Sequence, residues 1–291
     1  MRWRDLRRSS NVDDQRDGSP AGGGGFGGGA KLGGGGLLLV LVASLIFGVS
    51  PTEVLNLLGG GGTTVTAPQQ TPSRRASPSN DPAADFVSAV LGNTEDMWSQ
   101  WFQANGGHYQ QPKLVLFRDA AQSACGYASA AVGPFYCPGD KQVYLDLSFF
   151  QELSQRFGAP GDFAQAYVIA HEIGHHVQNL TGISAKVQAQ RQQSSEAQAN
   201  ALSVLLELQA DCLAGVWGHY AQQRGVLETG DVDEALKAAS AIGDDRLQRQ
   251  ARGYVTPDSF THGTSQQRME WFSRGLKTGD VNQCNTFAAR R

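Results

Sequence analysis

The sequence predicts an α+β domain that follows an N-terminal segment of different composition. Short stretches of β-branched and aromatic residues between positions 113 and 147 are typical of strands, whereas apolar residues recur at helical spacing from position 162 onward. Strands followed by helices are the pattern of an α+β fold. Residues 22–36 and 59–82 are too rich in Gly, Pro, Ser and Thr to pack a core, so we expect the folded domain over residues 84–291.

The first part of this domain carries signals for one helix and three strands. Residues 85–103 have apolar side chains at helical spacing, and residues 113–117 are typical of a short strand. Residues 135–137 and 142–147 flank the turn sequence Pro138-Gly139-Asp140, which predicts a β-hairpin. We expect the second strand of this hairpin to lie at the edge of the sheet, where an extended peptide can pair with it.

Four helices are expected in the rest of the domain, over residues 163–180, from 195 to beyond 217, over 233–252 and from 264 onward. Asp162 fits the N-cap of the first helix, and Gly182 follows its end. Ser195 and Thr264 are each followed three residues later by Gln, which is the capping-box pattern of a helix start. The helices therefore come after the strands, as the predicted fold class requires.

The charge of the chain gives no electrostatic case for a nucleic-acid partner. The whole chain holds 24 Lys and Arg against 27 Asp and Glu. The distribution is uneven, since residues 1–83 carry eight basic and six acidic residues (net +2), and residues 84–291 carry 16 and 21 (net −5). The N-terminal segment is therefore chemically distinct from the domain.

An apolar run in the N-terminal segment predicts a membrane anchor. Residues 33–49 form a stretch of 17 residues without a charge, which is at the short end of what spans a bilayer. Basic residues precede the run, so the positive-inside rule places residues 1–32 in the cytoplasm, an anchor at 33–58, a linker at 59–83 and the domain at 84–291 outside. A cleaved signal peptide is the alternative, but 36 residues precede Leu37 and no Ala-x-Ala site follows the run.

The chain has four cysteines, Cys125, Cys137, Cys212 and Cys284. An even number of cysteines in a domain outside the cytoplasm favours two disulfides. Cys125 and Cys137 are the natural local pair, which leaves Cys212 to pair with Cys284. Four buried free thiols are the alternative, and no Cys-x-x-Cys spacing indicates a cysteine metal site.

The first strong helix carries the metal-binding pattern His171-Glu172-Ile173-Gly174-His175. Residues four positions apart share one helical face, so both imidazoles can bind the same ion. Glu172 is angled beside that ion, where it can act as base on a bound water. Three fixed letters are a weak signal alone, and a chance match on an unrelated helix is the alternative. The uncharged surroundings and Gly174 favour the metal site.

A catalytic zinc ion takes three protein ligands and keeps one position open. The second long helix offers Glu207-Leu-Gln-Ala-Asp211, and Glu207 follows His175 by 32 positions. Glu207 can supply the third ligand, while Asp211, on the same face, can accept the free ring N–H of His171. A solvated acidic stripe is the alternative. Most residues around the pair are apolar, however, which makes unpartnered carboxylates costly there.

Other histidines and another metal chemistry are weaker candidates. His176 adjoins His175 but points about 100° away around the helix, so packing is expected for it, as for His108 and His219. Glu172-x-x-His175 also fits a carboxylate-bridged diiron site, which requires a second Glu-x-x-His. No second copy occurs in the chain, so this interpretation fails.

Taken together, these motifs resemble a family of bacterial neutral zinc metallopeptidases. The resemblance rests on HEIGHH, ELQAD, GPFYCPGDKQVYLDLSFF, SFTHGTSQQR and the opening MRWRDLRRSSNVDD, and it covers nearly the whole chain except the Gly-rich and Pro/Ser-rich inserts. It implies a glutamate-ligated zincin fold, with the active-site helix under a small sheet. It also implies one Zn²⁺ per chain held by His171, His175 and Glu207, with Glu172 as general base. Since the family is bacterial, the anchor expected from the apolar run would lie in the cytoplasmic membrane of a bacterium.

One downstream feature is similar to membrane CAAX-type and related glutamate zincins, in which Thr-His-Pro is followed by Arg. Here the sequence is Thr261-His262-Gly263, with Arg268 six positions after the histidine. Gly263 replaces the proline, so the loop geometry need not match. His262 is a candidate catalytic residue that stabilises the oxyanion. Simple packing at the start of the last helix is the alternative.

The sequence therefore predicts a membrane-anchored peptidase that hydrolyses protein or peptide substrates through a zinc-activated water, with Glu172 as base. The alternative is a non-catalytic zinc-stabilised adaptor or binding module of the cell envelope. Glu172 argues against the adaptor, because a structural zinc site has no use for a base beside the metal. The sequence carries no signal for oligomeric state or cleavage specificity.

Overall fold

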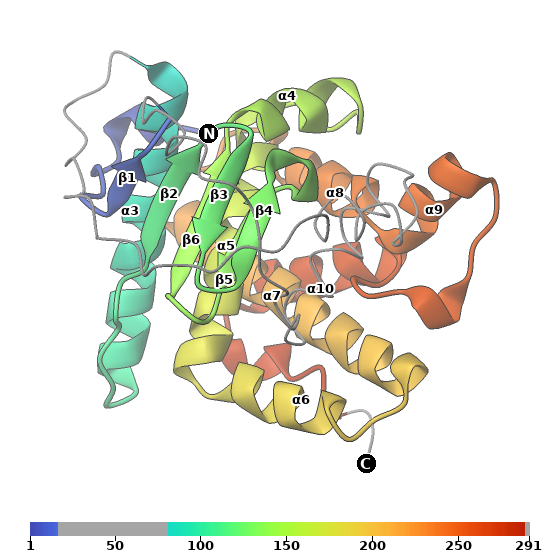
Figure 1. The fold of residues 1–291 in the computed structure, drawn as a ribbon. Helices are drawn as coiled ribbons and strands as arrows, with labels where there is room; N and C mark the ends of the chain where they lie inside the picture. The colour runs from blue at the N-terminus through green and yellow to red at the C-terminus, as the bar shows by residue number, and fades with distance from the viewer. Residues whose placement is uncertain (17–80, 289–291) are drawn as a thin grey trace, which may run out of the picture.

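The computed structural model describes residues 1–16 and 81–288 of the 291-residue chain. A mixed four-stranded sheet forms one part of the domain and helices form the rest, which is an α+β fold (Figure 1). The sheet contains, in spatial order, β1 (Val12–Asp14), β2 (Lys113–Phe117), β6 (Gln142–Asp146) and β5 (Phe135–Cys137). A separate hairpin pairs β3 (Ala120–Ser123) with β4 (Gly126–Ser129).

The α-helices among the described residues are α3 (Pro82–Ala104), α4 (Ser148–Gln155), α5 (Asp162–Leu180), α6 (Ile183–Arg191), α7 (Glu196–Gln223), α8 (Asp231–Ala241), α9 (Asp244–Arg252) and α10 (Ser265–Thr278). Short 3₁₀ turns occur at Trp3–Asp5, Ala130–Val132, Pro257–Ser259 and Val281–Cys284. In the view of Figure 1, α5 runs behind the sheet, and α7 and α10 lie to the lower right of α5. One hydrophobic core joins these layers, so the sheet fixes the position of α5.

The sheet confirms the predicted hairpin but not its predicted edge. β5 pairs with β6 antiparallel across the Pro138-Gly139-Asp140 turn, and β2 pairs with β6 parallel. β6 therefore has a neighbour on both sides and cannot accept an added strand. The sheet instead ends at β5 on this side, because within the described residues β5 pairs only with β6.

The predicted helix starts hold where a capping box marks them. The side chains of Ser195 and Thr264 each accept a hydrogen bond from the backbone N–H three residues on. The side-chain oxygen of the Gln at that position in turn accepts one from the backbone N–H of Ser195 or Thr264. Asp162 is not an N-cap: Gly161 occupies that position, and Asp162 is the first residue of α5. The predicted helix over 233–252 is two helices, broken at Gly243, where a Cβ would lie 2.4 Å from the backbone nitrogen of Ser265.

Helices α7 and α10 approach so closely that only glycine fits at two contact points. A Cβ at Gly215 would lie 2.1 Å from the carbonyl oxygen of Phe272. One at Gly275 would lie 1.9 Å from the carbonyl oxygen of Cys212. The tight crossing brings the first turn of α10 beside the acidic residues of α7.

Both predicted disulfides are present. Cys125 is bonded to Cys137, which ties the β3–β4 hairpin to strand β5. Cys212 is bonded to Cys284, which ties α7 to the 3₁₀ turn after α10. No free cysteine occurs among the described residues.

The first 16 residues belong to the folded domain, contrary to the prediction that it begins at residue 84. Strand β1 pairs with β2 in parallel, and the side chain of Trp3 packs on Phe86 of α3. The α-ammonium of Met1 lies 2.7 Å from Asp162, at the start of α5. The prediction failed because it treated the basic residues as a cytoplasmic tail, whereas arginines here pair with acidic residues of the domain.

The predicted anchor at 33–58 lies outside the described residues, as does nearly all of the predicted linker at 59–83. Within the described part of the chain, α7 alone is long and apolar enough to cross a membrane. Because 78% of its most apolar 18-residue stretch is buried inside the domain, α7 fits a core helix.

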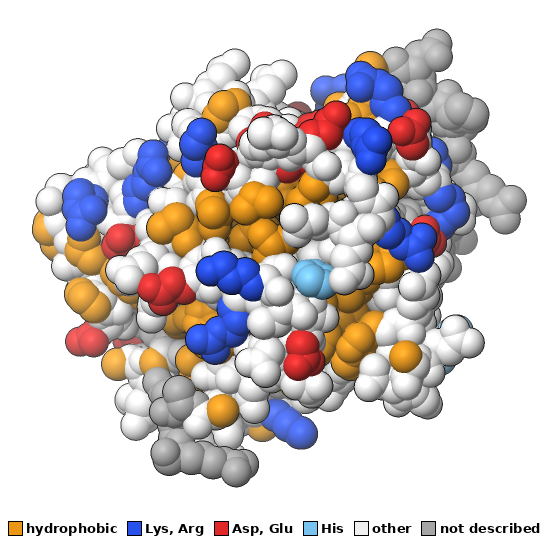
Figure 2. Space-filling model, turned by 180° about the vertical axis from the view of Figure 1, so that it is seen from behind, with side chains coloured by type: hydrophobic (Ala, Val, Ile, Leu, Met, Phe, Trp, Pro, Cys, Tyr) orange, Lys and Arg blue, Asp and Glu red, His pale blue; other side chains and the backbone are white. Residues whose placement is uncertain are grey.

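Acidic and basic side chains are interspersed on the face opposite to that of Figure 1, with hydrophobic side chains exposed between them (Figure 2). Such mixing produces no large field of one sign over this face.

Candidate active site

Helix α5 carries His171 and His175 on one face, one turn apart. Their Nε2 atoms lie 3.2 Å from each other, so the two rings converge on one point. Between them, Gly174 faces α7, where a Cβ would lie 3.0 Å from the carbonyl oxygen of Ala210. The missing side chain lets α5 and α7 approach closely, which brings Glu207 of α7 across to the two imidazoles.

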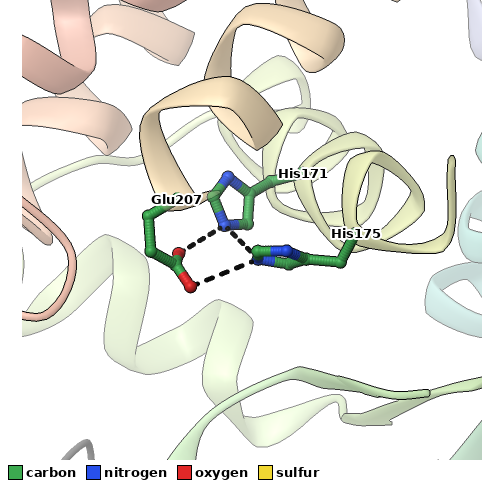
Figure 3. A group of neighbouring side chains, drawn as sticks. All are labelled: His171, His175 and Glu207. Atoms are coloured by element: carbon green, nitrogen blue, oxygen red, sulfur yellow. Dashed lines mark hydrogen bonds and ion pairs between the residues drawn. The ribbon is translucent and has the colours of Figure 1, made fainter. Parts of the chain in front are cut away.

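Glu207 completes a three-residue cluster with the two histidines (Figure 3). Its Oε2 lies 3.1 Å from Nε2 of His171, and its Oε1 lies 3.4 Å from Nε2 of His175. Ligands about 2.0–2.1 Å from a tetrahedral zinc ion lie about 3.3 Å from one another. The donor atoms therefore already stand at the spacing of a zinc site, and two nitrogens with one carboxylate are a ligand set that zinc accepts.

Asp211 holds the other side of the His171 ring. Its Oδ1 lies 2.8 Å from Nδ1 of His171, which directs Nε2 toward the cluster. Arg268 of α10 donates to both oxygens of Asp211 at 2.9 Å, and the hydroxyl of Tyr167 donates to Oδ1. Burial would raise the pKa of Asp211, but Arg268 and His171 outweigh it and hold that pKa low. Asp211 therefore stays ionised and orients the imidazole.

Gln178 orients the ring of His175 as Asp211 orients that of His171, and the sequence did not predict this role. Its Oε1 lies 2.9 Å from Nδ1 of His175, one helical turn away. Its Nε2 donates to the carbonyl oxygen of Leu206 at 2.7 Å and to Gln209 at 3.1 Å, so α7 fixes the amide. The spacing of three residues from His175 is the sequence signal that could have found it.

The electrostatics of the cluster favour a cation. Burial opposes protonation of His171, but Asp211 and Glu207 outweigh it and raise the pKa of His171 to about 10. Burial would raise the pKa of Glu207, but His175, His262 and His171 keep it well below its ordinary value. Arg268 balances Asp211, whereas Glu207 has no arginine or lysine partner among the described residues. A metal ion would take the place of the protons on the two imidazoles as the positive charge beside Glu207.

Glu172 lies beside the cluster without joining it. The 8% exposed side chain lines the same cavity as His171 and His175, and none of the described residues donates a hydrogen bond to its carboxylate. Burial outweighs the opposing charges of His171 and His175 and raises the pKa of Glu172 above that of an ordinary glutamate. A carboxylate with a raised pKa and free acceptor positions is suited to taking up a proton.

His262 also reaches this cavity, on a loop that Asp244 holds. Asp244 Oδ2 accepts backbone hydrogen bonds from Thr261, His262 and Gly263, and Oδ1 lies 3.2 Å from Nδ1 of His262. Burial opposes protonation of His262, but Asp244 and Glu207 outweigh it and raise the pKa. The structure thus places His262 at the cavity, in addition to packing it before α10.

Gly263 explains why this loop departs from the Thr-His-Pro pattern. Its φ is +91°, and its N–H donates to Asp244 at 3.0 Å. Proline fixes φ near −65° and has no N–H, so it fits neither feature. Arg268 does not serve as a free cation either, because Asp211, Tyr167 and the carbonyl of Ile242 occupy its guanidinium.

The cavity around the cluster has a volume of about 680 Å³. Strand β5 and the loop before it line one side, α6 lines another, and the ligands lie on α5 and α7. Its lining is largely apolar, with Phe135, Phe149, Phe157 and Leu247 among the contributors. The space therefore suits a ligand with apolar groups.

The remaining histidines do not take part in the cluster. His176 is fully buried, with its ring nitrogens 3.0 Å from the hydroxyl of Tyr136 and 2.6 Å from the carbonyl of Gln110. Burial lowers the pKa of His176 to about 4, so the ring is neutral at pH 7. His219 lies 2.8 Å from the carbonyl of Leu276.

Comparisons with known proteins identify the family of the chain. A family model described as "Putative neutral zinc metallopeptidase" matches residues 1–287. The chain is 54% identical over 287 residues to "Uncharacterized protein YpfJ" of Escherichia coli (strain K12), which covers 99% of each chain. It is 47% identical over 192 residues to "Uncharacterized protein Rv2575" of Mycobacterium tuberculosis, which covers 62% of this chain and 64% of that protein. No solved structure matches it. The chain belongs to the neutral zinc metallopeptidase family that this model describes.

Proposed function

We propose that the protein is a zinc-dependent peptidase, with His171, His175 and Glu207 as the zinc ligands and Glu172 as the general base. The observation that carries this proposal is the position of Glu172. It is a buried carboxylate beside three converging donor atoms, in a cavity large enough for a peptide. A site that only stabilised the fold would need no such group.

Bound zinc supplies two effects in such a site, a lowered pKa for its water and polarisation of the substrate carbonyl. The residues of the chain do the rest. Glu172 accepts the proton of the attacking water and later delivers it to the leaving nitrogen. His262, which Asp244 orients, donates a hydrogen bond to the developing oxyanion.

Strand β5 is the proposed docking edge for the substrate backbone. It ends the sheet on the side of the cavity, and Phe135 and Tyr136 line that cavity. An extended peptide can pair with such an edge through main-chain hydrogen bonds, while its side chains enter the apolar space. This assignment replaces the edge expected at 142–147.

The proposed location is the cytoplasmic membrane of a bacterium, with the apolar residues 33–58 as the membrane contact. Because residues 1–16 pack on the domain, the proposal places them on the same side of the membrane as residues 81–288. Arg16 and Asp81, the described residues that flank the intervening segment, form an ion pair.

Chelation tests the proposed reaction. The full chain should cleave members of a fluorogenic peptide library, lose that activity with 1,10-phenanthroline and regain it with added zinc. Zinc should be measured in the same samples by atomic emission. A chain that holds one zinc per molecule and cleaves nothing in the library would instead support the zinc-stabilised adaptor.

A further inference from the structure

One arginine in the wall of the cavity has no carboxylate partner among the described residues. Arg191, the last residue of α6, is partly buried and lines the same cavity as His175 and Glu207. Its Nε is buried without a hydrogen-bond partner, and its Nη1 donates to the neutral Oε1 of Gln188 at 3.3 Å. Burial lowers the pKa of Arg191, since no acidic group compensates it.

The position of Arg191 on its helix places it in the lining of the cavity that holds the His171, His175 and Glu207 cluster. Ser184, Gln188 and Arg191 are spaced by four and three residues, so they share the face of α6 that lines the cavity. Helix α6 follows α5 after a two-residue turn, and it packs on α7 as well. The guanidinium therefore stands on a short, packed helix that a two-residue turn joins to α5, which carries two of the proposed zinc ligands.

Arg16 and Arg268 are also largely buried, and both have the carboxylate partner that Arg191 lacks among the described residues. Arg16 lies against Asp14 and Asp81, and the fully buried Arg268 makes two hydrogen bonds to Asp211. Taking a guanidinium out of water without a partner is unfavourable, and its planar donors match a carboxylate in geometry. A carboxylate on the ligand of this cavity would supply both the charge and the acceptor.

We propose that Arg191 forms a carboxylate-binding subsite for the peptide substrate, beside an apolar space that takes its neighbouring side chain. This inference rests on the proposed function. The carboxylate can come from an Asp or Glu side chain or from the C-terminus of the peptide. The first source makes the protein an endopeptidase with a preference for acidic residues, and the second makes it act near the ends of peptides.

A matched peptide set separates these sources. Peptides of one apolar sequence would carry a free or an amidated C-terminus, and Asp or Asn at one position on either side of the scissile bond. We expect the parent to favour one carboxylate form at least tenfold in kcat/KM, mainly through KM. Arg191→Gln should remove that preference, and Arg191→Lys should restore part of it. Arg118→Gln, at an exposed arginine outside the cavity, should keep the preference.

Binding provides the readout that does not depend on hydrolysis. The same peptides, carrying a fluorophore, would be titrated with the zinc-loaded Glu172→Gln variant, with and without Arg191→Gln. Tighter binding of a carboxylate form, lost with Arg191→Gln, supports the subsite even if the parent cleaves nothing. Cleavage by the parent with equal rates and equal binding for acidic and neutral peptides overturns the subsite and leaves the peptidase proposal intact.

Discussion

At the scale of single residues, the site depends on groups that hold the imidazoles as much as on the imidazoles themselves. Asp211 and Gln178 each fix one histidine through Nδ1, and α10 fixes Asp211 through Arg268. The His-Glu pattern and the Glu-x-x-Ala-Asp pattern could be found in the sequence because each lies within one helix. The Arg268 contact could not, because it joins residues 57 positions apart through packing alone.

Glu207 is the proposed third zinc ligand, beside His171 and His175. Glu207→Ala should weaken zinc affinity by more than about 100-fold, since changes to groups behind the ligands already cost about 10- to 100-fold. Far-UV circular dichroism should be unchanged. Competition with a chromophoric chelator measures the affinity, and Glu196→Ala, at an exposed site on the same helix, is the control. Undiminished affinity in Glu207→Ala would remove Glu207 from the ligand set.

At the scale of elements, features that depend on local sequence signals were predicted correctly, whereas features that depend on long-range packing were missed. The helix starts at Ser195 and Thr264 and the hairpin turn at 138–140 depend on a few adjacent residues, and all three form as expected. Strand β1 was missed because three residues form it and its partner lies about 100 positions away. The break at Gly243 was missed because the close approach of Ser265, 22 residues further on, is not visible in the local sequence.

The crossing of α7 and α10 gives an element-scale prediction. The added methyl of Gly275→Ala would lie 1.9 Å from the carbonyl oxygen of Cys212, a collision that should cost about 2–3 kcal/mol. The gain of about 1 kcal/mol in helix propensity offsets part of this cost, so the free energy of unfolding should fall by about 1–2 kcal/mol. Urea unfolding measures it, with Lys277→Ala at an exposed position of α10 as the control. If Gly275→Ala were as stable as the parent, the close crossing would be wrong.

At the scale of the whole molecule, the N-terminal residues changed the interpretation most. The sequence presented residues 1–16 as the basic flank of an apolar run, and that flank agreed with the positive-inside rule. Composition cannot show that these arginines have acidic partners across the fold, such as Asp85 for Arg8 and Glu95 for Arg7. A strand and several ion pairs therefore bind the beginning of the chain to the domain.

For the proposed membrane location, this packing predicts that both described parts of the chain lie on one side of the membrane. Ser10→Cys and Gln223→Cys, both at exposed positions, would be labelled with a membrane-impermeant maleimide in intact and in lysed spheroplasts. Because the four native cysteines form disulfides, the parent is the unlabelled control. The two variants should be labelled together in intact spheroplasts or together only after lysis. Labelling of one variant without the other would mean that residues 1–16 and the rest of the domain lie on opposite sides of the membrane.

The central claim is that the cluster on α5 and α7 hydrolyses peptides with Glu172 as base. The most direct measurement compares the parent with Glu172→Gln, which keeps the shape of the side chain and removes the base. Zinc content should be equal, because Glu172 lies outside the ligand cluster. The rate of peptide hydrolysis should fall by about 10²- to 10⁴-fold, the usual worth of general base catalysis. Equal hydrolysis by parent and variant at equal zinc content would contradict the account.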